Sequence, residues 1–167
     1  MFKKGDFVMH PGYGAGLVTG IKSMTMNGNK RRYYYVDLMD GDRSLMIPVE
    51  EAEAVGLGPV VDEESILAVL RGEPGELEKD YRARQARMSK KIYSGDLEKV
   101  AEALRDLAWR RRNVQVSIKD GILLDKAKRL LASVLASHRP DRDFEKAQAR
   151  LSRVLLQNFQ QQEAASA

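Results

Sequence analysis

The fifteen residues from 56 to 70, GLGPVVDEESILAVL, separate two parts of the chain that have different sequence periods. Before them, short runs of β-branched and aromatic residues alternate with turn residues, a pattern typical of short strands. After Pro59, apolar residues recur at a spacing of about 3.6, beginning with Ile66 and Leu70, which indicates amphipathic helices. We therefore predict a β-domain over residues 1–58 and a helical domain over residues 60–163.

The first domain contains four strand-like runs. They lie at residues 7–9, 15–21, 32–38 and 44–48. Between them stand turn residues, and Asn27-Gly28 and Asp40-Gly41 are dipeptides typical of hairpins. A small sheet gains stability by curling and closing, because closure removes its exposed edges. We expect a small β-barrel of the SH3 or Tudor type.

The second domain is expected to be all-α, with about five helices. The predicted helices are 62–71, 76–93, one capped by Asp96, one capped by Ser117, and one opened by Pro140-Asp141. Residues 72–75, GEPG, should break the chain between the first two helices. The tail after Asn158 is expected to fray. The whole chain is thus predicted to have an α+β fold.

Composition limits the location of the protein and its partners. No apolar run among the 167 residues approaches the roughly 18 needed for a membrane span. With no signal-like N-terminus and no cysteine, we expect a cytoplasmic protein that makes no membrane contact. The net charge of +4 belongs to the second domain: residues 1–58 carry seven Lys/Arg and seven Asp/Glu, whereas residues 59–167 carry 21 and 17.

The sequence contains no familiar catalytic motif. It has no P-loop, no dinucleotide-binding glycine motif and no metal-spaced cluster, and its only histidines are His10 and His138. Adjacent carboxylates such as Glu50 and Glu51 fit a solvated surface better than a catalytic pair, because general acid–base chemistry needs a concave, dry site. We expect a binding protein with no enzymatic activity, no cofactor and no bound metal.

The densest basic stretch runs from residue 79 to residue 91, where six positive residues accompany one negative residue. A solvated helix face is the commoner explanation of such a run. Here, however, most of the positive residues have no acid four positions away, and Tyr81 stands near their start. Lys and Arg bind phosphates, and an aromatic side chain can wedge into a distorted minor groove. We predict a DNA contact through Tyr81, Arg82, Arg84, Arg87, Lys90 and Lys91.

Two other features allow more than one interpretation. Trp109 precedes three arginines at the end of a helix, where cations favour the negative end of the helix dipole. Its ring could pack between helices or contact nucleic acid, and packing is the favoured interpretation. Met24, Met26, Met39 and Met46 are also unusually many methionines for a small barrel. Some should fill its core, while others suit an adaptable protein interface.

Several motifs occur in a familiar order. Residues 2–16, FKKGDFVMHPGYGAG, are followed by residues 46–48, MIP, and 54–57, AVGL. The second domain contains SGD at 94–96, VAE at 100–102 and LRDL at 104–107. This ordered set, which spans residues 1–137, resembles the CarD/CdnL family of bacterial transcription regulators. Transcription-repair coupling factor carries a domain related to the first of the two.

The resemblance implies two partners and no sequence-specific operator. A Tudor-like first domain would bind the RNA polymerase β subunit. The second would contact promoter DNA at the upstream edge of the transcription bubble and stabilise the open complex with a wedged aromatic. Counting back from Ser94-Gly95, the wedge tryptophan of the family falls on Tyr81. The expected polymerase-binding residues are Met24, Tyr33, Met46 and Pro48, with Met24 standing where some relatives have arginine.

Two further hypotheses stay open at this point. In a protein-only adaptor, the barrel binds polymerase and the helices bind another protein, so the basic face serves only solubility. An RNA-binding factor would use the basic and aromatic run at residues 30–35, although the neutral first domain argues against it. The adaptor is the nearer alternative, and steeply salt-dependent DNA binding would distinguish the regulator from it. We expect a monomer, because docking on polymerase requires only one copy.

Overall fold

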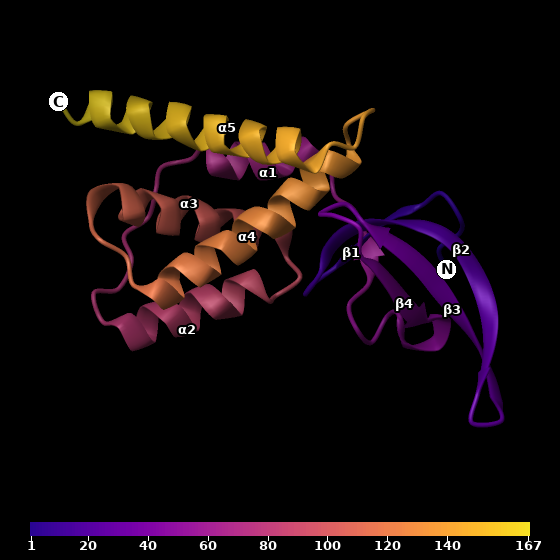
Figure 1. Cartoon of the computed structure of the whole chain (residues 1–167). Helices are drawn as coiled ribbons and strands as arrows, with labels where there is room; N and C mark the ends of the chain where they lie inside the picture. The colour runs from indigo at the N-terminus through magenta and orange to yellow at the C-terminus, as the bar shows by residue number, and fades with distance from the viewer.

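A twisted β-sheet and a bundle of helices lie side by side in the computed structural model, which describes residues 1–167 (Figure 1). The strands are β1 (Phe7–His10), β2 (Gly14–Met26), β3 (Asn29–Leu38), β4 (Ser44–Pro48) and β5 (Gly58–Pro59). They form one antiparallel sheet in the order β4-β3-β2-β1-β5. A short 3₁₀ helix, Val49–Glu51, follows β4. The predicted α+β fold is confirmed.

The β2–β3 hairpin is longer than the sequence pattern predicted. Asn27 and Gly28 both have positive φ angles, 52° and 78°, as a tight hairpin turn of type I′ requires. Pairing continues from Met26–Asn29 at this turn to Gly16–Leu38. The outer end of the hairpin carries exposed side chains and projects from the body of the domain (Figure 1). Alternation of apolar residues, the basis of the prediction, is weak over such a segment.

The helices are α1 (Glu63–Leu70), α2 (Tyr81–Ile92), α3 (Leu97–Asn113), α4 (Ile118–Ser137) and α5 (Phe144–Ala165). Helix α2 begins at residue 81 instead of 76, because Asp80 caps it by accepting from the Ala83 amide. Helix α5 likewise begins after the cap Asp143 instead of at Pro140. The predicted fraying after Asn158 is wrong: α5 continues to Ala165, since Phe159 is buried.

Helix α4 lies at the centre of the molecule and joins the two parts. It packs against α2, α3 and α5, and also against β2. The Ala15 amide donates to Ser133 Oγ over 2.8 Å in a buried hydrogen bond. Met9 and Ala15 belong to the same apolar core as the helices, whereas a second, smaller core lies within the sheet domain, whose sheet has β4 and β5 as its edges. The two parts are therefore held in a defined arrangement by a shared core.

Candidate nucleic-acid and polymerase interfaces

Helix α2 presents Tyr81 and Arg82 to solvent at its first turn. The buried side chains of Met88 and Ile92 fix the inner face of the helix in the bundle core. Tyr81 remains 53% exposed. Arg82 Nε donates to the Tyr81 hydroxyl over 3.1 Å, and the Arg82 guanidinium lies 5.6 Å from the centre of the tyrosine ring. An aromatic ring and a cation thus stand together on the surface, where both could meet a nucleic acid.

Arg84 lies on the opposite, inner side of α2 and is only 4% exposed. It forms a buried ion pair with Asp120 of α4, with Arg84 Nη2 and Asp120 Oδ2 2.8 Å apart. Its other terminal nitrogen donates to the backbone carbonyls of Glu78 and Lys79. The side chain is therefore engaged in holding α2, α4 and the preceding loop together, and it does not face the solvent where DNA would bind.

The remaining basic residues of α2 differ in how they are paired. Arg87 forms an ion pair with Glu78, and its hydrogen bond to that carboxylate lowers the pKa of Glu78. Lys91 pairs with Glu102 of α3 over 2.9 Å. Lys90 is exposed and has no acidic partner. Both pairs are partly exposed, and ion pairs at a protein surface contribute only about 0–1 kcal/mol, so Arg87 and Lys91 could exchange their carboxylates for phosphates at a small cost.

The surface beside α2 includes residues that sequence analysis missed. Gln85 donates a hydrogen bond to Ser117 near the starts of α2 and α4, and the Lys126 ammonium lies over the Tyr93 ring near the end of α2. The two helices therefore run in the same direction. The outer face of α4 exposes Ile118 (87%) and Ile122 (62%). Lys119 and Arg129 are also exposed on α4. Ile118 and Ile122 fall outside the apolar stripe that faces the core, which is the signal that could have identified them.

The four predicted polymerase-binding residues lie on one face of the sheet, formed by β2, β3 and β4. Tyr33 pairs with Pro48 across the β3–β4 ladder, and Tyr35 pairs with Met46. The Tyr35 hydroxyl donates to Met24 Sδ over 3.1 Å. We call this surface the methionine face: Met24, Met26, Tyr35, Met46 and Pro48. Tyr33 is on the same face but is only 8% exposed, and its hydroxyl donates to Met26 Sδ. It therefore packs beneath the methionine side chains and is not itself an exposed contact residue.

Trp109 packs within the helical domain. Its ring lies 5.2 Å from that of Phe159, which joins the end of α3 to α5. Phe159 is thus the packing partner that the favoured interpretation of Trp109 requires.

No helix combines the length and the apolar character that crossing a membrane requires. No three acidic or histidine side chains are grouped in a way that could hold a metal ion.

Comparisons with known proteins support the resemblance seen in the motifs. Residues 2–61 match the family model described as the CarD-like/TRCF RID domain, and residues 65–152 match the CarD C-terminal domain. The chain is also 25% identical over 138 residues to "Putative transcription factor YdeB" of Bacillus subtilis (strain 168). The aligned region covers 81% of this chain and 90% of that protein. Because the two family models together span most of its length, the chain belongs to the CarD-like family of transcription factors.

Proposed function

We propose that this protein binds the RNA polymerase β subunit through its methionine face and promoter DNA through α2, and thereby stabilises the open promoter complex. The observation that carries the proposal is the exposed Tyr81–Arg82 pair in a domain of the CarD C-terminal type. The protein acts by binding alone, as a cytoplasmic monomer, and without enzymatic chemistry. The matched domain descriptions and the positions of the exposed residues support this assignment.

The proposed DNA contact combines a wedge with phosphate-binding cations. Tyr81 has a flat apolar ring that can enter a distorted base step in the minor groove. Arg82 and Lys90 supply charges that are free of intramolecular carboxylates. Lys119 and Arg129 are further exposed cations on α4, the helix that packs against α2. Such contacts bind DNA of any sequence and weaken steeply as salt is added, because bound counterions are released.

The proposed polymerase contact is apolar with a basic margin. Met24 and Met46 are 36% and 44% exposed, and thioether side chains adapt to the shape of a partner surface. Lys22, whose ammonium lies 5.0 Å from the Tyr35 ring centre, stands beside them. Strand β4 is also at the edge of the sheet and so has unpaired backbone groups. A strand of the β subunit could add to this edge while its side chains meet the methionines.

The open-complex lifetime on a promoter fragment, measured with the cognate polymerase, tests the proposal. The wild-type protein should lengthen the lifetime, and both Tyr81→Ala and Met46→Arg should abolish much of that effect. Tyr93→Ala is a matched control for the first variant, since Tyr93 is 55% exposed at the far end of α2. Val55→Arg is the control for the second, because Val55 is 41% exposed outside the methionine face.

The same experiment distinguishes the adaptor hypothesis. A protein-only adaptor would bind the β subunit and lose that binding in Met46→Arg, but its effect on polymerase would not change in Tyr81→Ala. Its affinity for promoter DNA would also lack a steep dependence on salt. If the wild-type protein bound neither the β subunit nor promoter complexes, the proposed function would be wrong.

A further inference from the structure

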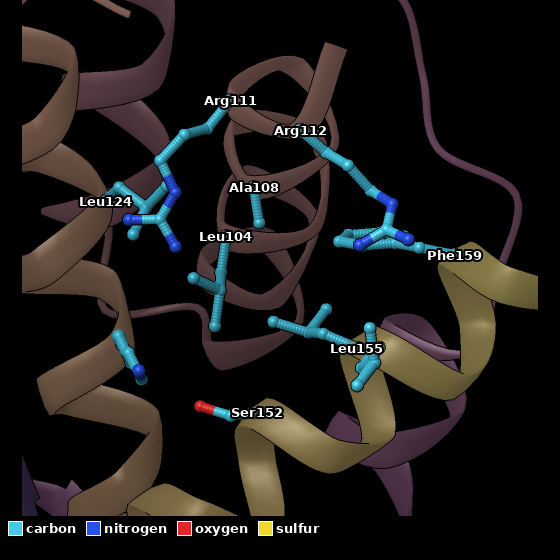
Figure 2. Close-up of a pocket in the computed structure, with 10 residues that line it drawn as sticks. Leu104, Ala108, Arg111, Arg112, Leu124, Ser152, Leu155 and Phe159 are labelled. Atoms are coloured by element: carbon cyan, nitrogen blue, oxygen red, sulfur yellow. The ribbon is translucent and has the colours of Figure 1, made fainter.

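A cavity opens between α3, α4 and α5 on a part of the surface that α2 does not line (Figure 2). Its volume is about 250 Å³. The walls are mainly apolar and come from all three helices: Leu104, Ala108, Leu124, Leu155, Leu156 and Phe159. Ser152 points its hydroxyl toward the hollow from α5 (Figure 2). The cavity is thus an apolar recess in the helical domain, separate from the proposed DNA contact.

Three cations line the same cavity: Arg111, Arg112 and Lys128. Arg112 is held by Glu163 through two hydrogen bonds, which leaves little of its charge unpaired. Arg111 and Lys128, from α3 and α4, form no ion pair with any carboxylate of the chain. Two unpaired positive charges therefore stand at an apolar recess, and they favour a negatively charged occupant.

The size of the recess fits a small molecule. A buried cavity of about 150 Å³ holds one benzene, which has six heavy atoms. By the same scale, this cavity holds about ten heavy atoms, the size of a medium-length alkyl chain or a two-ring aromatic. A concave apolar site with a few convergent polar groups is also the usual form of a small-molecule site.

We propose that this cavity binds a small amphiphilic anion. Its apolar tail or ring would lie against Leu104, Leu155 and Phe159. Its carboxylate, sulfonate or phosphate would lie between Arg111 and Lys128, with the Ser152 hydroxyl available as a further donor. The inference does not depend on polymerase or DNA binding, since neither α2 nor the β-sheet lines the cavity.

Titration calorimetry of the full-length protein with decanoate tests the proposal, and decyltrimethylammonium serves as a cationic probe of equal tail length. We expect decanoate to bind one site about tenfold more tightly than decyltrimethylammonium, because the cavity cations attract one head and repel the other. Arg111→Gln and Lys128→Gln should each weaken decanoate binding severalfold. Arg153→Gln, an exposed change on α5 that does not line the cavity, should leave it unchanged.

A variant that fills the recess separates binding inside it from binding elsewhere on the surface. Ala108 lines the cavity and is 8% exposed, so Ala108→Leu should occupy the space and abolish decanoate binding. Thermal unfolding of Ala108→Leu should show that the domain remains folded. The proposal is overturned if decanoate does not bind, if the cationic probe binds equally well, or if folded Ala108→Leu binds as wild type does.

Discussion

Replacing Arg84 distinguishes a structural role of this residue from a direct role in DNA binding. Arg84→Met keeps the length and apolar stem of the side chain but removes the charge and all of its hydrogen bonds. Asp120 would then be a buried carboxylate, 1% exposed, without its cationic partner. Its Oδ1 atom already has no hydrogen-bond partner, so the pair with Arg84 is the main compensation for its charge.

The expected loss follows from that burial. Removing one member of a buried ion pair costs about 3–5 kcal/mol, because it leaves an uncompensated charge in the interior. For a chain of this size, each kcal/mol lowers the melting temperature by about 2–4 °C. We therefore expect Arg84→Met to melt about 6–20 °C below the wild type. The backbone carbonyls of Glu78 and Lys79, which also lose a donor, add to this loss.

Thermal and urea unfolding, followed by circular dichroism, would measure the effect. Arg82→Met is the matched control, since Arg82 is exposed and its replacement should change stability by no more than about 0.5 kcal/mol. The double variant Arg84→Met, Asp120→Leu removes both charges and should recover much of the loss. Equal melting temperatures for Arg84→Met and Arg82→Met would refute the structural role of Arg84.

Three further predictions address other contacts. Lys90→Ala should reduce the slope of log affinity for promoter DNA against log salt by about 1 and leave the melting temperature unchanged, as binding titrations at several salt concentrations would show. Burial, and then the charge of Lys126, lowers the pKa of His10 from 6.5, and His10 Nδ1 accepts from the amides of Gly12 and Tyr13. The unfolded chain therefore takes up the proton first, so stability should fall as pH drops below about 6.5, and His10→Asn should flatten that part of the curve measured by urea unfolding. Gly14 has φ of 98° and an added Cβ would lie 2.7 Å from Ser133 Oγ, so Gly14→Ala should destabilise the protein by about 1–3 kcal/mol in the same assay.

Much of the fold could be predicted because its signals are local. Asp96 and Ser117 were recognised as helix caps, and each accepts a hydrogen bond from a backbone amide of the first turn. Asp80 and Asp143 are helix caps of the same kind, but each follows closely on other helix-breaking or capping residues, at 72–75 and at Pro140-Asp141. The starts of α2 and α5 were therefore predicted several residues too early. The packing of Ala15 against Ser133 joins residues 118 positions apart and has no local signal.

The candidate site was harder to predict, because charge alone does not say which side of a helix faces outward. Arg84 is four residues before Met88 and eight before Ile92, so it lies on the same buried stripe. That spacing is visible in the sequence. The partner that makes burial possible, Asp120, is 36 residues away, and nothing local indicates that it faces Arg84. A basic run therefore needs its apolar register examined before each cation is assigned to a ligand.

The contacts of Arg84 also bear on the proposed mechanism. A tyrosine has a smaller ring than the tryptophan that the family resemblance places at this position, so a wedge formed by Tyr81 depends more on being held in place. Arg84 fixes the first turn of α2 to α4, and Ser133 fixes α4 to β2. Strand β2 carries Met24 of the methionine face. Because these contacts fix Tyr81 relative to the methionine face, polymerase binding at that face would determine where Tyr81 meets the DNA. The entropy of ordering α2 is lost in folding and need not be lost again on binding. The proposed function thus relies on the buried arginine as well as on the exposed ones.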